Sequence, residues 1–198
     1  PSAIDAVTAV GVDAIAICTG SGSPIEALAE AERAGRPAWC SLAGAAEAGD
    51  GAALSGRPFA VGLHRRFDAG HHSVHDAVRR GELGTVRTCR VVSRGVDPLV
   101  GSRSLTEVLT EDIDLARFVT GCDVVAVSAQ RQAVDCIVVM LTHGHGIVTT
   151  IESALTSPYG PDQRVEVFGD TGMAASENPP GIGGVVATAA GITRPTLD

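Results

Sequence analysis

The first third of the chain alternates helix and strand patterns, as parallel sheets do. Residues 13–18 form a continuous apolar run, which is typical of a buried parallel strand that leads into a ligand-facing turn. A helical pattern then ends at Gly35 and is followed by short strands at 37–40 and 58–62. These elements predict a partial Rossmann-type parallel sheet over residues 1–62, equivalent to half of a doubly wound domain.

The pattern changes at residue 63. Helical periodicity returns twice, with Asp68 at the start of the first helix and Gly121 at the end of the second. The helices are expected at about 68–80 and 103–120, and the strands at about 84–94, 123–131, 134–142, 146–155 and 163–168. Helices followed by consecutive strands predict an α+β domain over 63–198 with a largely antiparallel sheet. The Pro, Gly and Ala that dominate after Gly172 predict a loosely ordered end.

Composition excludes several kinds of partner. The 198 residues are 44% hydrophobic, which suffices for one compact domain or two small ones. A formal charge of −8 argues against nucleic acid, whose phosphates select clustered basic side chains. The apolar runs fall short of the roughly 18 residues of a membrane span, and the first residues lack the charged and apolar regions of a signal peptide. We therefore expect a soluble cytoplasmic protein without nucleic-acid or membrane partners.

Two residue types narrow the chemistry further. All 15 basic residues are arginines, so a mechanism that needs a lysine ammonium or a Schiff base is closed to this chain. The five cysteines are scattered singly and form no C-x-x-C pair. This pattern predicts buried, reduced thiols and neither a disulfide nor a metal site.

Six short segments carry a pattern that extends over about residues 2–178. The segments are 12–18, 34–40, 61–68, 81–84, 112–118 and 164–169. In order and spacing they resemble the Gfo/Idh/MocA family of sugar and inositol dehydrogenases. The resemblance implies an N-terminal Rossmann domain, a substrate site between two domains, and a C-terminal α/β domain whose open sheet supports a homo-oligomer.

The chain departs from this family pattern where the nucleotide binds. No G-x-G-x-x-G precedes the strand at 13–18, so about 60 residues of the pattern, with the glycine loop for the pyrophosphate and the acid for the ribose, are missing here. Residues 39–42 stand where the family carries the Glu-Lys-Pro turn of its catalytic lysine. We therefore expect no cofactor for this chain alone. If NAD or NADP is used, Thr19 and Gly20 are expected to contact it.

A third departure lies in the helix at 103–120. Inositol dehydrogenase-like members show an Asp and, four residues on, the His that takes the substrate hydroxyl proton, and Glu107 and Glu111 occupy these positions here. Together with Asp114 they share one helix face, where like charges repel. If this face points into a cleft, one carboxyl would stay protonated beside a carboxylate base, which makes Glu107 and Glu111 the candidate catalytic residues. The alternative is a solvated face on which Arg117 neutralises Asp114.

Candidate substrate-binding residues lie at the end of the strand at 58–62 and in a later loop. His64 and Arg65 follow that strand, where open α/β sheets place ligand groups. Asp114, at a position of the family pattern, and Tyr159 are the other two candidates. The loop around Tyr159 resembles a family substrate loop. The alternatives are a histidine without a catalytic role, an arginine that braces the domain junction and a tyrosine that only packs.

Three histidines follow closely along the next helix. His71 and His75 share a helix face beside Asp76, which is compatible with a metal site. The sequence lacks the Glu of H-E-x-x-H and an obvious third ligand. An exposed helix face is therefore favoured for His71, His72 and His75, and no metal is expected.

These features favour a shortened member of the family that keeps the substrate-binding layer. We expect it to bind a small polyhydroxylated or carbonyl-bearing molecule and to perform cofactor-free acid/base chemistry, such as isomerisation, dehydration or cyclisation. One alternative is an NAD(P)-dependent inositol or sugar dehydrogenase whose nucleotide-binding segment and catalytic-lysine loop are missing from this chain. The other is a non-catalytic pseudoenzyme or scaffold that uses the open sheet for assembly.

Overall fold

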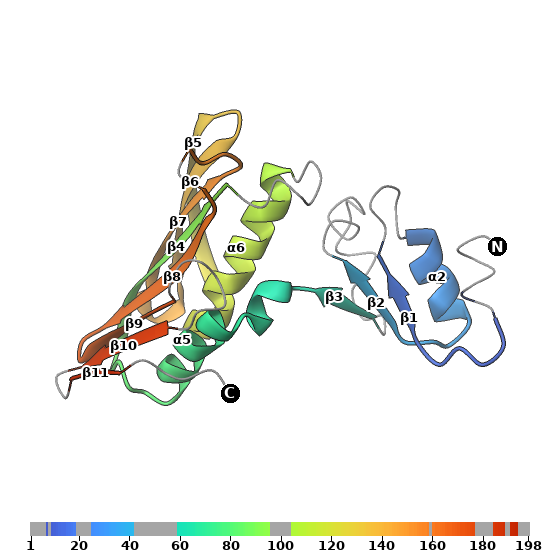
Figure 1. Ribbon diagram of the computed structural model, residues 1–198, viewed down its shortest axis with the longest axis horizontal. Helices are drawn as coiled ribbons and strands as arrows, with labels where there is room; N and C mark the ends of the chain where they lie inside the picture. Colours follow the sequence, from blue (N-terminus) through green and yellow to red (C-terminus); the bar gives the residue numbers. More distant parts are fainter. Residues whose placement is uncertain are drawn as a thin grey trace. The chain divides into compact units, whose positions relative to one another are not determined.

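A computed structural model shows how the predicted elements are arranged (Figure 1). It describes residues 7, 9–18, 25–41, 59–95, 104–158, 160–176, 184–188 and 191–193. These residues form a mixed α/β structure, as predicted, and the chain divides into two compact units, Pro1–Leu63 and His64–Asp198. Each unit has its own hydrophobic core.

The first unit holds a small parallel sheet. Its strands are β1 (Ile15–Ile17), β2 (Ala38–Ser41) and β3 (Phe59–Gly62). They lie in the order β1-β2-β3, and both neighbouring pairs are parallel. This confirms the predicted Rossmann-type parallel sheet, although β1 is shorter than the apolar run at 13–18.

Helix α2 (Ile25–Arg33) covers this sheet with one apolar face. Leu28 and Ala31 are three residues apart and so share that face, and both are buried in the core of the first unit. Gly35 follows the helix in the left-handed conformation, with φ 65°, and the amide of Arg36 donates to the carbonyl of Ala31. A glycine is favoured at this helix end because a Cβ would be strained there.

The second unit is built on one large sheet. Its strands are β4 (Val86–Arg94), β5 (Val124–Ala133), β6 (Cys136–His143), β7 (Val148–Ala154), β8 (Asp162–Gly169), β9 (Gly172–Ser176), β10 (Gly184–Thr188) and β11 (Gly191–Thr193). They lie in the order β11-β10-β9-β8-β4-β7-β6-β5. Only the pair of β4 and β7 is parallel among the described pairs, which confirms the predicted largely antiparallel sheet.

The two predicted helices of this unit begin and end close to the expected positions. They are α5 (Ala69–Arg79) and α6 (Leu105–Thr120). The structure adds two short helices that were not predicted, η1 (His64–Phe67) and η2 (Gly144–Gly146). Asp68 caps α5 by accepting from the amide of His71 at 3.0 Å, and Gly121 ends α6 in the left-handed conformation. None of the described helices combines the length and apolar character that crossing a membrane requires.

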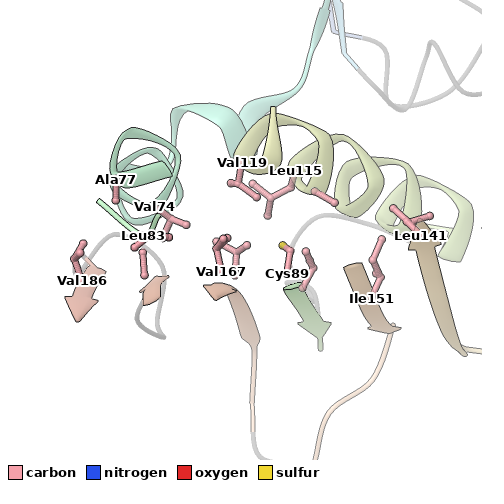
Figure 2. Close-up of a cluster of buried hydrophobic side chains, with 14 of the residues drawn as sticks. Val74, Ala77, Leu83, Cys89, Leu115, Val119, Leu141, Ile151, Val167 and Val186 are labelled. Carbon is pink, nitrogen blue, oxygen red and sulfur yellow. The ribbon is translucent and has the colours of Figure 1, made fainter. Parts of the chain in front are cut away.

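Helices α5 and α6 cover one face of the large sheet and fill its core (Figure 2). Leu115 and Val119 of α6 and Val74 of α5 point toward the sheet, where Cys89 and Val167 point back at them. All five side chains are almost fully buried. Burying a side chain of this size contributes roughly 1.5–3 kcal/mol, so this layer holds both helices firmly against the strands.

The other face of the large sheet, here called the outer face, carries paired charges. Arg90 of β4 lies 2.9 Å from Glu152 of β7 and 3.7 Å from Glu166 of β8. Val138 and Met140 of β6 alternate with core residues and are 36% and 47% exposed. The outer face therefore combines neutralised charges with exposed apolar side chains.

The described residues after Gly172 form strands, so the prediction of a loosely ordered end is wrong for them. Strand β9 pairs with β8 and β10, and β10 pairs with β11. A Cβ at Gly184 would lie 2.4 Å from Oγ of Ser73 and 2.9 Å from the carbonyl oxygen of Ala175. Small residues suggest disorder in isolation, but here they let β10 pass closely beneath α5.

The cysteines differ in burial, so the prediction of buried thiols is right for only some of them. Cys40 and Cys89 are buried, Cys18 is exposed, and Cys122 and Cys136 are intermediate; all five are free. Burial raises the pKa of Cys89 to about 12, so this thiol stays protonated and behaves as a small apolar side chain.

Candidate functional site

A buried arginine connects η1 to α6. Arg65 is 3% exposed, and its Nε donates to Oε2 of Glu111 at 3.0 Å. Its Nη1 donates to Oγ of Ser93 at 2.7 Å and also to Oδ1 of Asp112. Glu111 and Asp112 are 3% and 0% exposed. One guanidinium therefore serves two buried carboxyl groups that are neighbours on the same helix.

Two serines complete the surroundings of Asp112. Ser93 of β4 and Ser153 of β7 are register partners, so their side chains point to the same face of the sheet. Their hydroxyls donate to the two carboxylate oxygens of Asp112, each at 2.6 Å. Asp112 thus accepts hydrogen bonds from three side chains, which offsets the cost of burying it.

Sequence reasoning missed Asp112, Ser93 and Ser153. One signal in the sequence was available. Ser93 follows the buried Val91 by two residues and so points to the same, inward face of its strand. A polar side chain in that position needs a hydrogen-bond partner. The identity of that partner depends on contacts between distant parts of the chain.

His64 brings an exposed imidazole to the buried network. Its side chain is 65% exposed, and Nδ1 lies 3.3 Å from Oε1 of Glu111, whose side chain is 3% exposed. The other carboxylate oxygen of Glu111 is held by Arg65. The structure therefore brings together three sequence-predicted residues, His64, Arg65 and Glu111, and fixes the carboxylate behind the imidazole.

Arg65 also carries a donor that the network does not use. Its Nη2 is buried and has no hydrogen-bond partner among the described residues. Buried polar atoms are nearly always paired. A water molecule enclosed beside this nitrogen would satisfy it.

Glu107 serves the start of α6. Its Oε2 accepts from the amide of Ser104 at 2.6 Å, and its own amide donates to Oγ of Ser104 at 3.2 Å, which together form a capping box. Glu107 and Glu111 thus have separate hydrogen-bond partners, Ser104 and Arg65.

The alternative interpretation of α6, a solvated face, paired Asp114 with Arg117, and this pairing is wrong. Asp114 is 12% exposed in its side chain and receives both Nε and Nη2 of Arg66. Arg117 instead contacts Asp123 at 2.6 Å. Helical spacing predicted that Arg117 lies near Asp114, but Arg66 of η1 contacts Asp114 through two nitrogen atoms.

The histidines of α5 do not form the single exposed face that was predicted. His71 is 2% exposed, and its Nδ1 lies 3.1 Å from the carbonyl oxygen of Arg65. Burial lowers the pKa of His71, so its ring is neutral at pH 7. His72 and His75 lie beside Asp76 and are more accessible.

Three predicted contact residues lie outside the described residues. They are Tyr159, which was a candidate for substrate, and Thr19 and Gly20, which were candidates for the cofactor.

Sequence comparison finds relatives whose names describe dehydrogenases and oxidoreductases. An inositol 2-dehydrogenase of Rhizobium meliloti is 30% identical over 98% of this chain and 66% of its own length. An oxidoreductase of Bacillus subtilis described as uncharacterized, YrbE, is 30% identical over 84% of this chain and 56% of its own length. The chain therefore spans between about half and two thirds of these relatives.

A solved structure shows the same fold. The putative myo-inositol dehydrogenase of Sinorhizobium meliloti superposes with a TM-score of 0.75 at 27% identity, over 98% of this chain and 67% of that one. The family description "GFO/IDH/MocA C-terminal domain" matches residues 71–175, which include most of α5, all of α6 and strands β4 to β8. With more than half of its residues matched in this way, the chain belongs to the Gfo/Idh/MocA family.

Proposed function

We propose that this chain forms the substrate-binding part of an oxidoreductase that uses NAD or NADP and acts on a small polyhydroxylated ring such as inositol. The names of the relatives at 27% and 30% identity support a dehydrogenase of this class. Cofactor-free acid/base chemistry by Glu107 and Glu111 has less support, because Glu107 caps α6 and Glu111 is ion-paired with Arg65.

The contact between His64 and Glu111 carries this proposal. In the inositol dehydrogenase pattern, the histidine that takes the hydroxyl proton stands at position 111, where this chain has a glutamate. Here His64 places an imidazole 3.3 Å from that glutamate. The proton-accepting ring would thus come from His64 at the start of η1, while α6 supplies the carboxylate that orients it.

The chemistry follows from the two ring nitrogens of His64. A proton on Nδ1 shared with Glu111 leaves Nε2 as the acceptor for a substrate hydroxyl proton. Arg65 holds Glu111 in place from the other side and so acts as a positioning residue. Asp114 and Tyr159 remain candidates for contact with substrate hydroxyls.

The residues of this chain do not by themselves fit a dinucleotide. The described strands of the first unit end at Ile17, Ser41 and Gly62, where open parallel sheets bind ligands. The sequence contains no G-x-G-x-x-G, the turn whose amides approach a pyrophosphate. We therefore assign only substrate-side roles to this chain.

The outer face of the large sheet supports a further part of the proposal, which is assembly into a homo-oligomer. Val138, Met140 and Phe168 are 36%, 47% and 39% exposed on strands of this sheet. The arginines between them are neutralised within the chain, so covering the face would not bury unpaired charge. A second copy of the chain is the proposed partner.

The test uses the protein encoded by the complete reading frame that contains this chain. Oxidation of a panel of inositols and sugars is measured with NAD and with NADP. His64→Gln should lower kcat by about 10²- to 10⁴-fold, the usual effect of losing a general base, with a much smaller change in KM. His145→Gln, at an exposed histidine of η2, should leave both constants unchanged.

The outcomes separate the two parts of the proposal. If the wild-type protein oxidises none of these substrates with either cofactor, the dehydrogenase function is wrong. If it does so and His64→Gln is as active as wild type, the function stands and the role of His64 is wrong.

A further inference from the structure

Helix α5 brings two histidines and one aspartate together. The potential ligand atoms of His72, His75 and Asp76 all lie within 4.8 Å of one another. Nδ1 of His72 is 3.4 Å from Oδ2 of Asp76, and Nδ1 of His75 is 3.1 Å from Oδ1. We propose that these three side chains, here called the α5 triad, bind a divalent late first-row transition-metal ion, for which Zn²⁺ is the chosen probe.

The separations within the α5 triad are close to those between the ligands of a metal ion. Metal–ligand bonds of about 2.0–2.1 Å in tetrahedral geometry leave neighbouring ligand atoms about 3.3–3.4 Å apart. The distances from the two histidines to Asp76 are near this value, and each runs to a different carboxylate oxygen. One imidazole must therefore shift toward the other to share an ion, and the side chain of His72, which is 53% exposed, has room to rotate.

The donor set selects the kind of ion. Two imidazole nitrogens and one carboxylate suit Zn²⁺, Cu²⁺ or Ni²⁺, whereas Mg²⁺ and Ca²⁺ prefer ligand sets made of oxygen. Three protein ligands leave a fourth position for water. The α5 triad would therefore form an open site.

The fold already orders one of the three ligands. The ring of His75 stacks on Phe118 of α6, with centroids 4.0 Å apart and planes 4° apart. The guanidinium of Arg66 lies 5.6 Å from the centroid of the same Phe118 ring. Because the His75 ring is held before binding, less conformational entropy is lost when an ion is captured.

The charges around the α5 triad do not oppose a cation. Arg80 acts on Asp76 electrostatically, but it is ion-paired with Glu82 at 2.6 Å. Arg66, near Phe118, is ion-paired with Asp114. Both neighbouring arginines are thus neutralised, and the carboxylate of Asp76 balances part of the ion's charge.

Calorimetric titration with ZnCl₂ tests the proposal. The protein is prepared without a histidine tag and with Cys18→Ser, because an exposed thiol would compete for zinc. We expect one Zn²⁺ per chain with a micromolar Kd, and no binding of Mg²⁺. His72→Ala and His75→Phe should each weaken binding by about tenfold or more, and phenylalanine at position 75 preserves the stack on Phe118.

A matched control and a folding check complete the experiment. His145→Ala removes an exposed histidine outside the α5 triad and should bind zinc as the parent does. Circular dichroism confirms that each variant is folded. A parent protein that takes up no zinc, or folded His72→Ala and His75→Phe variants that bind as tightly as the parent, would overturn the proposal.

Discussion

Arg65 joins two carboxyl groups of α6 to the sheet at a single buried point. Its guanidinium contacts Glu111 and Asp112 and reaches Ser93 on β4. Removing one partner of a buried charged network leaves the others without compensation, and this loss usually exceeds the net contribution of the intact pair. Arg66, the next residue, forms an ion pair whose arginine side chain is 39% exposed.

The contrast between these neighbours predicts unequal effects on stability. Arg65→Met should lower the free energy of unfolding by about 3–5 kcal/mol, because it leaves two buried carboxyl groups without the guanidinium that compensates their charge. Arg66→Met should cost less than Arg65→Met, because the arginine of this pair is partly exposed and water screens its charge. Urea denaturation of both variants measures the difference, and equal losses would contradict the assignment of Arg65 as the buried centre of the network.

At the level of secondary structure, the start of α6 depends on reciprocal hydrogen bonds between Ser104 and Glu107. These bonds satisfy the amide of Ser104 and give the amide of Glu107, which also donates to the carbonyl oxygen of Ser104, a side-chain acceptor. The same helix carries Glu111, Asp112 and Asp114, so its position along the sheet determines where these carboxylates lie. The capping motif thus stabilises the helix end that lies one turn before Glu111.

This capping role predicts how two substitutions differ. Ser104→Ala should lower the free energy of unfolding by about 0.5–2 kcal/mol, because the side-chain acceptor is lost. Glu107→Gln should change it little, since the amide oxygen can still accept from the amide of Ser104. Thermal or urea denaturation provides the measurement. A loss in Glu107→Gln as large as that in Ser104→Ala would show that the carboxylate charge has another task.

At the scale of the whole molecule, the large sheet uses its two faces differently. One face is closed by α5 and α6 over a continuous apolar core (Figure 2). The outer face exposes Met140 and Val138 among neutralised arginines and glutamates. Exposed apolar side chains of this kind, rimmed by polar groups, mark interaction surfaces.

The proposed homo-oligomer predicts that a charge on the outer face disrupts assembly. Met140→Arg should shift the protein toward monomer, because an unpaired charge would be buried in the interface. Val134→Arg, at an 82% exposed position between β5 and β6, should leave assembly unchanged. Light scattering coupled to size-exclusion chromatography reports the mass. A wild-type protein that is monomeric at micromolar concentration would rule out this interface.

The candidate site could be predicted in part. His64 and Arg65 were predicted as site residues because they follow a parallel strand. Glu111 and Asp114 were predicted from helical spacing together with the family pattern. The ion-pair partners of these residues could not be predicted from the sequence in the same way. The alternative interpretation of a solvated face paired Asp114 with Arg117, one helical turn away, but Arg66, 48 residues away along the chain, is its partner.

The sequence by itself determined the local elements and the class of fold. Apolar periodicity, capping residues and glycines act within a few residues, so they fixed the helices α5 and α6, most strands and the change from a parallel to a mainly antiparallel sheet. Only the tertiary structure decided which polar groups meet. Ser93 and Ser153 reach Asp112 because β4 and β7 pair in one particular register, and no local pattern encodes a register between strands so far apart in the chain.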